Sequence, residues 1–170
     1  MYETPQELMR LQRILDESAQ AAGPHMQEVI TRERWLSAEQ LVERLHGMVL
    51  LVLGTATSDG KPLVGPVDSY FIHGSFFFSS GRRSVRMRHL SVRPAVSACH
   101  LPSEGLAVTV HGSADLFEIS DPRRPELRQA MLDHYLPLQG EAFQEWLETE
   151  DILAARIDAR KLITFHLESP

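Results

Sequence analysis

Residues 48–81 read MVLLVLGTATSDGKPLVGPVDSYFIHGSFFFSSG. From Met48 onward the apolar residues recur with a period of two, and β-branched and aromatic residues are frequent, which favours strands over helices. Ser58-Asp59-Gly60 and His73-Gly74 are turn signals, because glycine adopts the positive φ angles that tight hairpin turns require. We therefore predict three antiparallel strands, over residues 49–57, 62–72 and 75–79, joined as a meander.

Two more strands and a short basic segment follow this meander. Residues 80–93 are rich in arginine and predict a short helix that ends before Pro94, because proline breaks a helix. Strands are expected over residues 95–101 and 106–119. Further on, Asp121-Pro122 is expected to cap a helix and a shorter helix follows Gly140. Two closing strands, over residues 152–157 and 162–167, complete the chain.

The first third of the sequence predicts helices. Thr4 and Glu7 have the spacing of a capping box, with Pro5 at the first helical position, where its missing N–H costs nothing. Gly23-Pro24 ends that helix. A second capping box over residues 37–40 begins a helix that runs to about His46. We expect this region, residues 1–47, to form a helical arm.

Six or seven short antiparallel strands with few helices predict an α+β, mainly β chain that folds as a closed or partly open barrel, because barrel closure removes exposed strand edges. The sequence contains no internal repeat and no linker. We therefore predict one domain over residues 1–170. Its parts are the arm (1–47), a barrel core (48–119), peripheral helices (120–150) and closing strands (151–170).

The composition is that of a globular protein. The 170 residues are 43% hydrophobic and 24% charged, with 10 glycines and 10 prolines, which excludes a disordered or low-complexity chain. The longest apolar stretch, Met48 to Leu53, is far shorter than the ~20 residues that span a bilayer. The first residues do not read as a signal sequence. We expect a soluble, cytoplasmic protein without disulfides, since Cys99 is the single cysteine.

The charge is distributed unevenly along the chain. The formal net charge is −6, yet residues 69–103 contain five arginines and no Asp or Glu. An acidic protein is a poor partner for nucleic acid, whose phosphates favour broad basic surfaces. A small phosphorylated ligand fits the basic segment better. No metal site is expected, because no two of the eight histidines have chelating spacing in a helix or strand.

The basic segment can form an anion site. If its helix begins near Arg82, four basic residues share one face of the helix, and Ser80 and Ser84 can donate hydroxyl hydrogen bonds in front of them. Free N–H groups at the helix start point at the same space, which suits a phosphate monoester. The alternative is an exposed basic helix that balances the acidic flanks. The residues of the predicted stripe are Arg82, Arg86, His89 and Arg93.

Four ordered segments, residues 53–67, 78–86, 93–96 and 108–114, resemble the FMN-binding split-barrel superfamily of pyridoxamine 5'-phosphate oxidase-like proteins. The resemblance implies a split barrel in which FMN phosphate is held by Ser80 and by the triplet Ser84-Val85-Arg86. It also implies that the second strand runs beside the ribityl chain and the isoalloxazine ring. The cofactor-binding residues implied are Gly65, Pro66, Val67, Asp68, Ser69, Tyr70, Ser79, Ser80, Arg82, Arg83, Ser84, Val85 and Arg86.

Departures from the pattern of the true oxidase concern its substrate site. Val85 replaces the middle arginine of the triplet, Gly65 and Tyr70 replace basic residues of the second strand, and the C-terminal Arg-x-x-Pro signature is missing from residues 162–170. We therefore expect an FMN-dependent oxidoreductase, of the flavin or deazaflavin branch, whose substrate is not pyridoxamine phosphate. No catalytic residue is assigned. Tyr70 and His73 are candidates only by their position beyond the flavin strand.

Three alternatives remain open. Coenzyme F420 could occupy the same groove if additional arginines held its longer anionic tail. The protein could be a non-catalytic carrier or sensor of flavin or of haem bound through a lone histidine. The basic helix could instead dock a protein or nucleic acid. The superfamily also implies a homodimer with the cofactor at the subunit interface, without nucleic-acid or membrane partners, and we expect residues 76–78 and 162–167 in the dimer core. The arginines available to F420 are Arg82, Arg83, Arg88 and Arg93.

Overall fold

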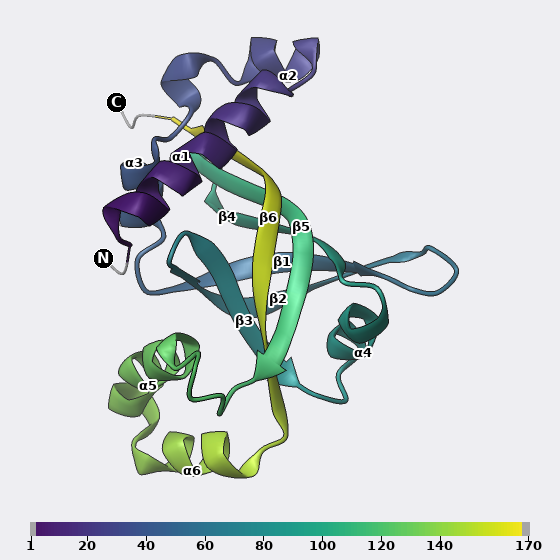
Figure 1. Cartoon of the computed structure of the whole chain (residues 1–170), viewed down its shortest axis with the longest axis vertical. Coiled ribbons are helices and arrows are strands. Elements are labelled where there is room, and N and C mark those ends of the chain that lie inside the picture. The colour runs from purple at the N-terminus through teal and green to yellow at the C-terminus, as the bar shows by residue number, and fades with distance from the viewer. Residues whose placement is uncertain (1–2, 168–170) are drawn as a thin grey trace.

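Six antiparallel strands form a closed barrel with the order β1-β2-β3-β6-β5-β4 in the computed structural model (Figure 1), which describes residues 3–167. The predicted fold class is confirmed. Closure pairs β1 with both β2 and β4, so the sheet has no free outer strand. The strands are β1 (Met48–Ala56), β2 (Pro62–Ile72), β3 (Ser75–Gly81), β4 (Ala95–Ser103), β5 (Leu106–Glu118) and β6 (Ile152–His166).

The predicted meander is present over β1, β2 and β3. β1 pairs with β2 from Met48 opposite Tyr70 to Ala56 opposite Pro62, and β2 pairs with β3 from Ser69 to Ile72. Positive φ angles occur at Gly60 in the first turn (82°) and at Gly74 in the second (71°). Glycine reaches this conformation without steric cost, so both turn signals acted as the sequence indicated.

The end of the chain forms one strand where two were predicted. β6 runs for 15 residues and pairs with β3 at its beginning and with β5 along its length. A register shift between His111 and Gly112 accommodates residues 158–161, which were predicted to separate two strands. A Cβ at Gly112 would collide with the Asp158 carbonyl, so glycine permits the close approach of the two strands at this bulge.

Helices α1 to α3 lie at one end of the barrel and α5 and α6 at the other, whereas α4 lies at its side (Figure 1). Both capping boxes are present, at Thr4 with Glu7 and at Ser37 with Gln40. None of the described helices is long and apolar enough to cross a membrane. The helices are α1 (Pro5–Gln20), α2 (Pro24–Val29), the 3₁₀ helix η1 (Arg32–Arg34), α3 (Ala38–Arg44), α4 (Val85–Val92), α5 (Glu126–Gln139) and α6 (Glu141–Thr149).

Two predicted helix starts were wrong. α4 begins at Val85 with Ser84 as its N-cap, so Arg82 precedes the helix. α5 begins at Glu126 rather than at Asp121-Pro122. The Asp121 carboxylate instead accepts hydrogen bonds from the main chain and side chain of Arg123, which form a turn before the helix. At α5, therefore, a residue suited to a cap is used in the preceding turn.

The chain has two hydrophobic cores on opposite faces of the barrel wall. Phe76 and Phe78 point into the barrel, whereas Phe77 points outward into a second core under α5 and α6. This alternation follows from the period of two along a strand. The expectation that residues 76–78 contribute to a dimer core is wrong, because all three side chains are at most 6% exposed in a single chain. Of residues 162–167, Leu162 is buried inside the barrel, whereas Leu167 is 42% exposed.

Candidate functional site

A pocket of about 530 Å³ lies between β2, the end of β3, α4 and the α5–α6 hairpin. It contains residues that the sequence predicted and others that it did not. A second hollow, of about 550 Å³, lies between α1 and residues 27–36 and contains none of the predicted residues. The first pocket is lined by Pro66, Val67, Asp68, Tyr70, Ser79, Ser80, Gly81, Arg86, Met131, Tyr135, Gln139, Phe143, Trp146 and Ile152.

One wall of the pocket is an unpaired strand edge. β2 pairs with β1 from residue 62 to residue 70 but with β3 only from Ser69 onward, so its other edge has no strand partner before Ser69. The Pro66 carbonyl on this edge accepts a hydrogen bond from Arg86 Nη1 at 2.8 Å. Main-chain groups of alternate residues face the same edge, so the Asp68 N–H and C=O also point to this side. The edge can therefore hydrogen-bond to a planar ligand.

The polar end of the pocket carries hydrogen-bond donors. The Ser79 hydroxyl donates to the Met131 sulfur at 3.6 Å, whereas the Ser80 hydroxyl has no protein partner within residues 3–167. In the same range no carboxylate pairs with the Arg86 guanidinium. The first turn of α4 adds main-chain N–H groups that lack a partner inside the helix. This combination of donors is suited to a phosphate.

The predicted cationic stripe is wrong. Arg82 donates to Glu118 and to Asp151, each at 2.6 Å, and these hydrogen bonds raise the pKa of its guanidinium. Arg93, the C-cap of α4, donates to the Ala56 carbonyl at 3.1 Å. These contacts follow from the later start of α4, which leaves Arg82 in a turn beside acidic residues. Among the four residues of the stripe, Arg86 is the one that lines the pocket.

The remaining predicted residues have other surroundings. A Cβ built on Gly65 would lie 3.4 Å from Arg86 Nη2, so this residue adjoins the site without lining it. Ser69 is buried and its hydroxyl donates to the Phe77 carbonyl at 2.8 Å. Tyr70, though on the pocket wall, is 4% exposed and belongs to the second core. Three residues lie outside the lining: Arg83, which is exposed, Ser84, which is the N-cap of α4, and Val85, which is 46% exposed.

His73, a candidate catalytic residue by its position, lies away from this pocket. Its ring nitrogen contacts the Glu7 carboxylate at 3.1 Å, next to α1. The contact joins the β2–β3 turn to the helical arm. The structure thus places His73 at a junction between elements and not among the pocket residues.

The opposite wall of the pocket is aromatic and was not foreseen. Tyr135 of α5 packs on Phe143 of α6 with ring centroids 4.7 Å apart, and Phe143 stacks on Trp146 at 5.5 Å. We call these three side chains the aromatic wall. Trp146 lines the pocket and is 42% exposed. The spacing of Phe143 and Trp146 indicated one helix face but not the surface that it covers.

A hydrogen bond connects the two walls. The Tyr135 hydroxyl on α5 donates to the Asp68 carboxylate on β2. Burial raises the pKa of Tyr135, and the hydrogen bond to Asp68 raises it further, so the phenol remains a donor at neutral pH. Asp68 and Arg86 are the two charged side chains in the lining.

Proteins of similar structure are known, although no similar sequence was found. No family model matches the sequence, and no curated protein matches it. A conserved hypothetical protein of Mycobacterium tuberculosis matches with a TM-score of 0.65 and 16% identity, over 82% of this chain and 93% of its own. The haem storage protein HutZ of Vibrio cholerae matches at 0.61 and 18%, over 77% and 95%.

A FAD-binding protein of Mesorhizobium loti matches with a TM-score of 0.57 and 16% identity, over 80% of this chain and 97% of its own. An F420 reductase and a putative pyridoxamine 5'-phosphate oxidase of Listeria innocua match at 0.51 and 0.53, each with 17% identity. They cover 69% and 72% of this chain and 91% and 92% of their own. At such low identity these likenesses show the shared fold.

Proposed function

We propose that this protein is an FMN-binding oxidoreductase of the pyridoxamine 5'-phosphate oxidase-like superfamily that acts on a small substrate. The observation that carries the proposal is the convergence of the unpaired β2 edge, the Ser80 hydroxyl and the Arg86 guanidinium in one pocket. A pocket of about 530 Å³ falls within the range of cofactor sites. Solved proteins of this fold include one named as FAD-binding, which supports a flavin-type ligand.

Each part of the pocket has a role in this proposal. Ser80, Arg86 and the first turn of α4 would hold the phosphate, because they offer donors that lack a carboxylate partner. The β2 edge from Pro66 to Asp68, which has no strand partner on this side, would orient the ring by main-chain hydrogen bonds. FMN supplies hydride or electron transfer when it is bound, whereas the chain binds, orients and shields it. The α5–α6 hairpin excludes water from one side of the pocket.

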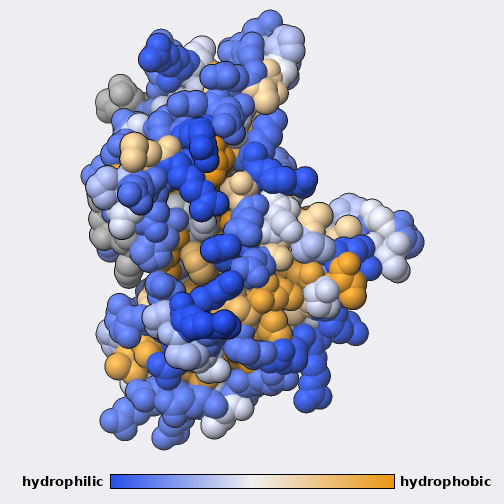
Figure 2. All heavy atoms as spheres, in the orientation of Figure 1, coloured by the Kyte–Doolittle hydropathy of each residue, from blue (hydrophilic) through white to orange (hydrophobic). Residues whose placement is uncertain are grey.

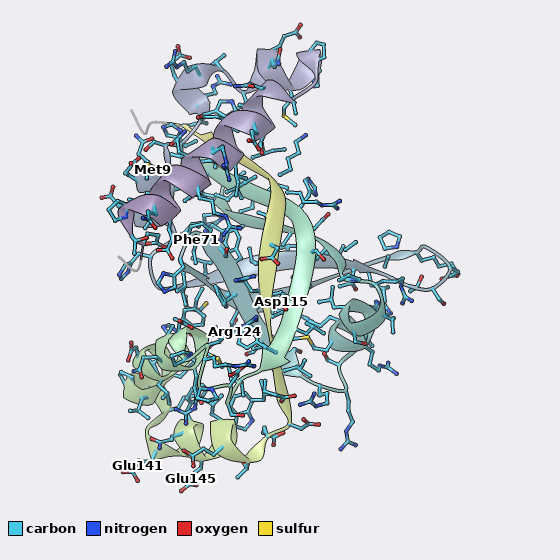
Figure 3. The ribbon with its side chains drawn as sticks, viewed as in Figure 1. Met9, Phe71, Asp115, Arg124, Glu141 and Glu145 are labelled. Carbon is cyan, nitrogen blue, oxygen red and sulfur yellow. The ribbon has the colours of Figure 1, made fainter. Side chains whose placement is uncertain are left out.

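The charge of the site favours FMN over F420 or haem. F420 carries a longer anionic tail, but Arg82 is neutralised by two carboxylates and α6 has three glutamates and no basic residue. Glu141 and Glu145 of α6 point outward, away from the barrel (Figure 3). A single phosphate needs fewer cations. No histidine is among the residues that line this pocket, so its described part offers no axial haem ligand.

A homodimer with the cofactor near the subunit interface forms part of the proposal. Leu50 and Val52 on β1 and Leu101 on β4 are 54%, 48% and 61% exposed, and these two strands are neighbours. Figure 2, in whose view β5 and β6 lie in front of β1, shows further hydrophobic atoms between mostly hydrophilic helices. Burial of such a face favours association of a second copy. Light scattering at micromolar concentration should give twice the mass of one chain, and a monomer would contradict this part.

The absorption spectrum of the purified protein tests the cofactor. FMN predicts two visible bands, a deazaflavin predicts one, and haem predicts an intense Soret band. Protein that is isolated without a chromophore is titrated with FMN, and quenching of flavin fluorescence reports binding. A protein that neither retains nor accepts FMN would refute the proposal. The electron donor is then sought by reduction of the bound flavin with NADH or NADPH, which separates an enzyme from a carrier.

A further inference from the structure

The aromatic wall is more exposed than packing alone requires. Phe143 is 5% exposed and belongs to the second core, but Trp146 next to it is 42% exposed while it lines the pocket. The rings of Phe143 and Trp146 are within 29° of parallel, and those of Tyr135 and Phe143 are within 32°. A row of nearly parallel rings on one side of a pocket offers a stacking surface for another flat ring.

The charges near this wall are negative. If a cofactor phosphate takes Arg86, Asp68 is the remaining charged side chain of the lining. Asp68 lies on the β2 edge and is tied to the wall by the Tyr135 hydroxyl. The helix that carries Trp146 has three glutamates and no Lys or Arg, and a fourth glutamate, Glu150, follows it. This electrostatic field attracts cations and repels anions.

We propose that the aromatic wall and Asp68 bind a planar aromatic cation, of the N-alkylpyridinium or phenothiazinium type, as the second ligand of the pocket. The ring stacks on Trp146, and its positive charge interacts with the indole face and with the Asp68 carboxylate. Tyr135 positions that carboxylate through its hydrogen bond. The inference rests on the proposed function in one respect, because it assigns Arg86 to the cofactor phosphate. It gives that function a substrate class.

The test compares two dyes of similar size and opposite charge. Methylene blue is a planar phenothiazinium cation, and resorufin is a planar anion at neutral pH. Binding of each is measured by isothermal titration calorimetry, with the protein alone and with the protein saturated with FMN. We expect saturable binding of methylene blue in both cases, and affinity for resorufin at least about tenfold lower.

Variants assign the binding to the wall. Trp146→Ala removes the stacking surface, and Asp68→Asn removes the charge without a change of shape. Each should weaken methylene blue binding by about fivefold or more. Two controls alter an aromatic ring and a carboxylate elsewhere: Trp35→Phe, in the hollow beside α1, and Glu141→Gln, on the outward face of α6 (Figure 3). Both should stay within about twofold of the parent protein. Circular dichroism checks the fold of each variant, and Asp68→Asn, an exposed strand position, keeps the test valid if Trp146→Ala unfolds.

The outcomes separate this inference from the proposed function. If FMN binds but methylene blue does not, or if the two dyes bind equally, the inference fails and the proposed function stands. If methylene blue binds through Trp146 and Asp68 in a protein that rejects FMN, the proposed function fails and the ligand class stands. If FMN competes with methylene blue, or if Trp146→Ala weakens both ligands by the same factor, the wall belongs to the cofactor and the inference is overturned.

Discussion

Arg82 and Arg86 lie four positions apart in the sequence, and the start of α4 lies between them. Arg82 is in the preceding turn and donates to two carboxylates, whereas Arg86 is in the first turn of the helix and donates to a main-chain carbonyl of β2. A guanidinium held by two carboxylates has no net charge to offer an anion. The position of the helix start, and not the number of arginines, therefore decides which guanidinium is available to bind an anion.

The largest expected effect is that of Arg86→Ala. The substitution removes a charge-assisted contact to phosphate worth ~1.5–3 kcal/mol, so FMN affinity should fall roughly 10- to 150-fold. Quenching of flavin fluorescence measures the dissociation constant. Arg88→Ala, an exposed residue of the same helix outside the pocket lining, is the matched control and should change little. Unchanged FMN affinity in Arg86→Ala would mean that the phosphate binds elsewhere. Arg82 and Arg86 would then not differ in their contribution to FMN binding.

Gly65→Val should act through Arg86 and have a smaller effect. A Cβ at this position would already be 3.4 Å from Arg86 Nη2, so the branched side chain of valine would displace the guanidinium from the Pro66 carbonyl. FMN affinity should fall about three- to tenfold, the cost of one disturbed hydrogen bond. Gly65→Ala is the control, because its Cβ makes only ordinary van der Waals contact. The same substitution in an Arg86→Ala background should have almost no effect, and a full additive loss would contradict this mechanism.

Ser80→Ala tests the strand end that faces Arg86 across the pocket. The Ser80 hydroxyl has no protein partner within the described residues, so its removal should leave the melting temperature unchanged and reduce FMN affinity about two- to tenfold. Ser79→Ala is the matched neighbour, since the Ser79 hydroxyl already donates to Met131. Equal losses of affinity in both variants would show that the phosphate does not distinguish these two hydroxyls.

Arg82→Ala should have the smallest effect on the cofactor. FMN affinity should stay within about twofold of the parent value, because exposed ion pairs contribute little and this guanidinium is already neutralised. Thermal unfolding should show a small decrease in melting temperature from the loss of contacts to β5 and to the residue before β6. A loss of FMN affinity as large as that of Arg86→Ala would mean that Arg82 releases its carboxylates when the ligand binds.

The parts of the fold that could be predicted are those with local signals. The meander over residues 48–81 has two glycine turns and an unambiguous period of two, and both N-terminal capping boxes are formed as expected. β6 was missed because the bulge that keeps it continuous depends on Gly112 of another strand. The start of α4 was missed because Ser84, as well as residues before it, has a side chain that can cap a helix.

The candidate site also has parts that could be predicted from the sequence and parts that could not. The β2 edge, Ser80 and Arg86 could be named from the sequence, because they lie close together along the chain and match a recognisable pattern. The aromatic wall could not be named, because Tyr135 and Trp146 follow Asp68 by more than 60 residues. No pattern within α5 or α6 indicates which face of the barrel these helices cover.

Residue type and short-range spacing are enough to predict the strand alternation, the turns, the acid-free basic segment and the donors around residues 80–86. They do not predict which arginine faces the pocket or which rings line its other wall, because side-chain pairing depends on distance in space. Glu118 and Asp151 reach Arg82 only after the barrel has closed, and Tyr135 reaches Asp68 only after α5 has packed on the second core.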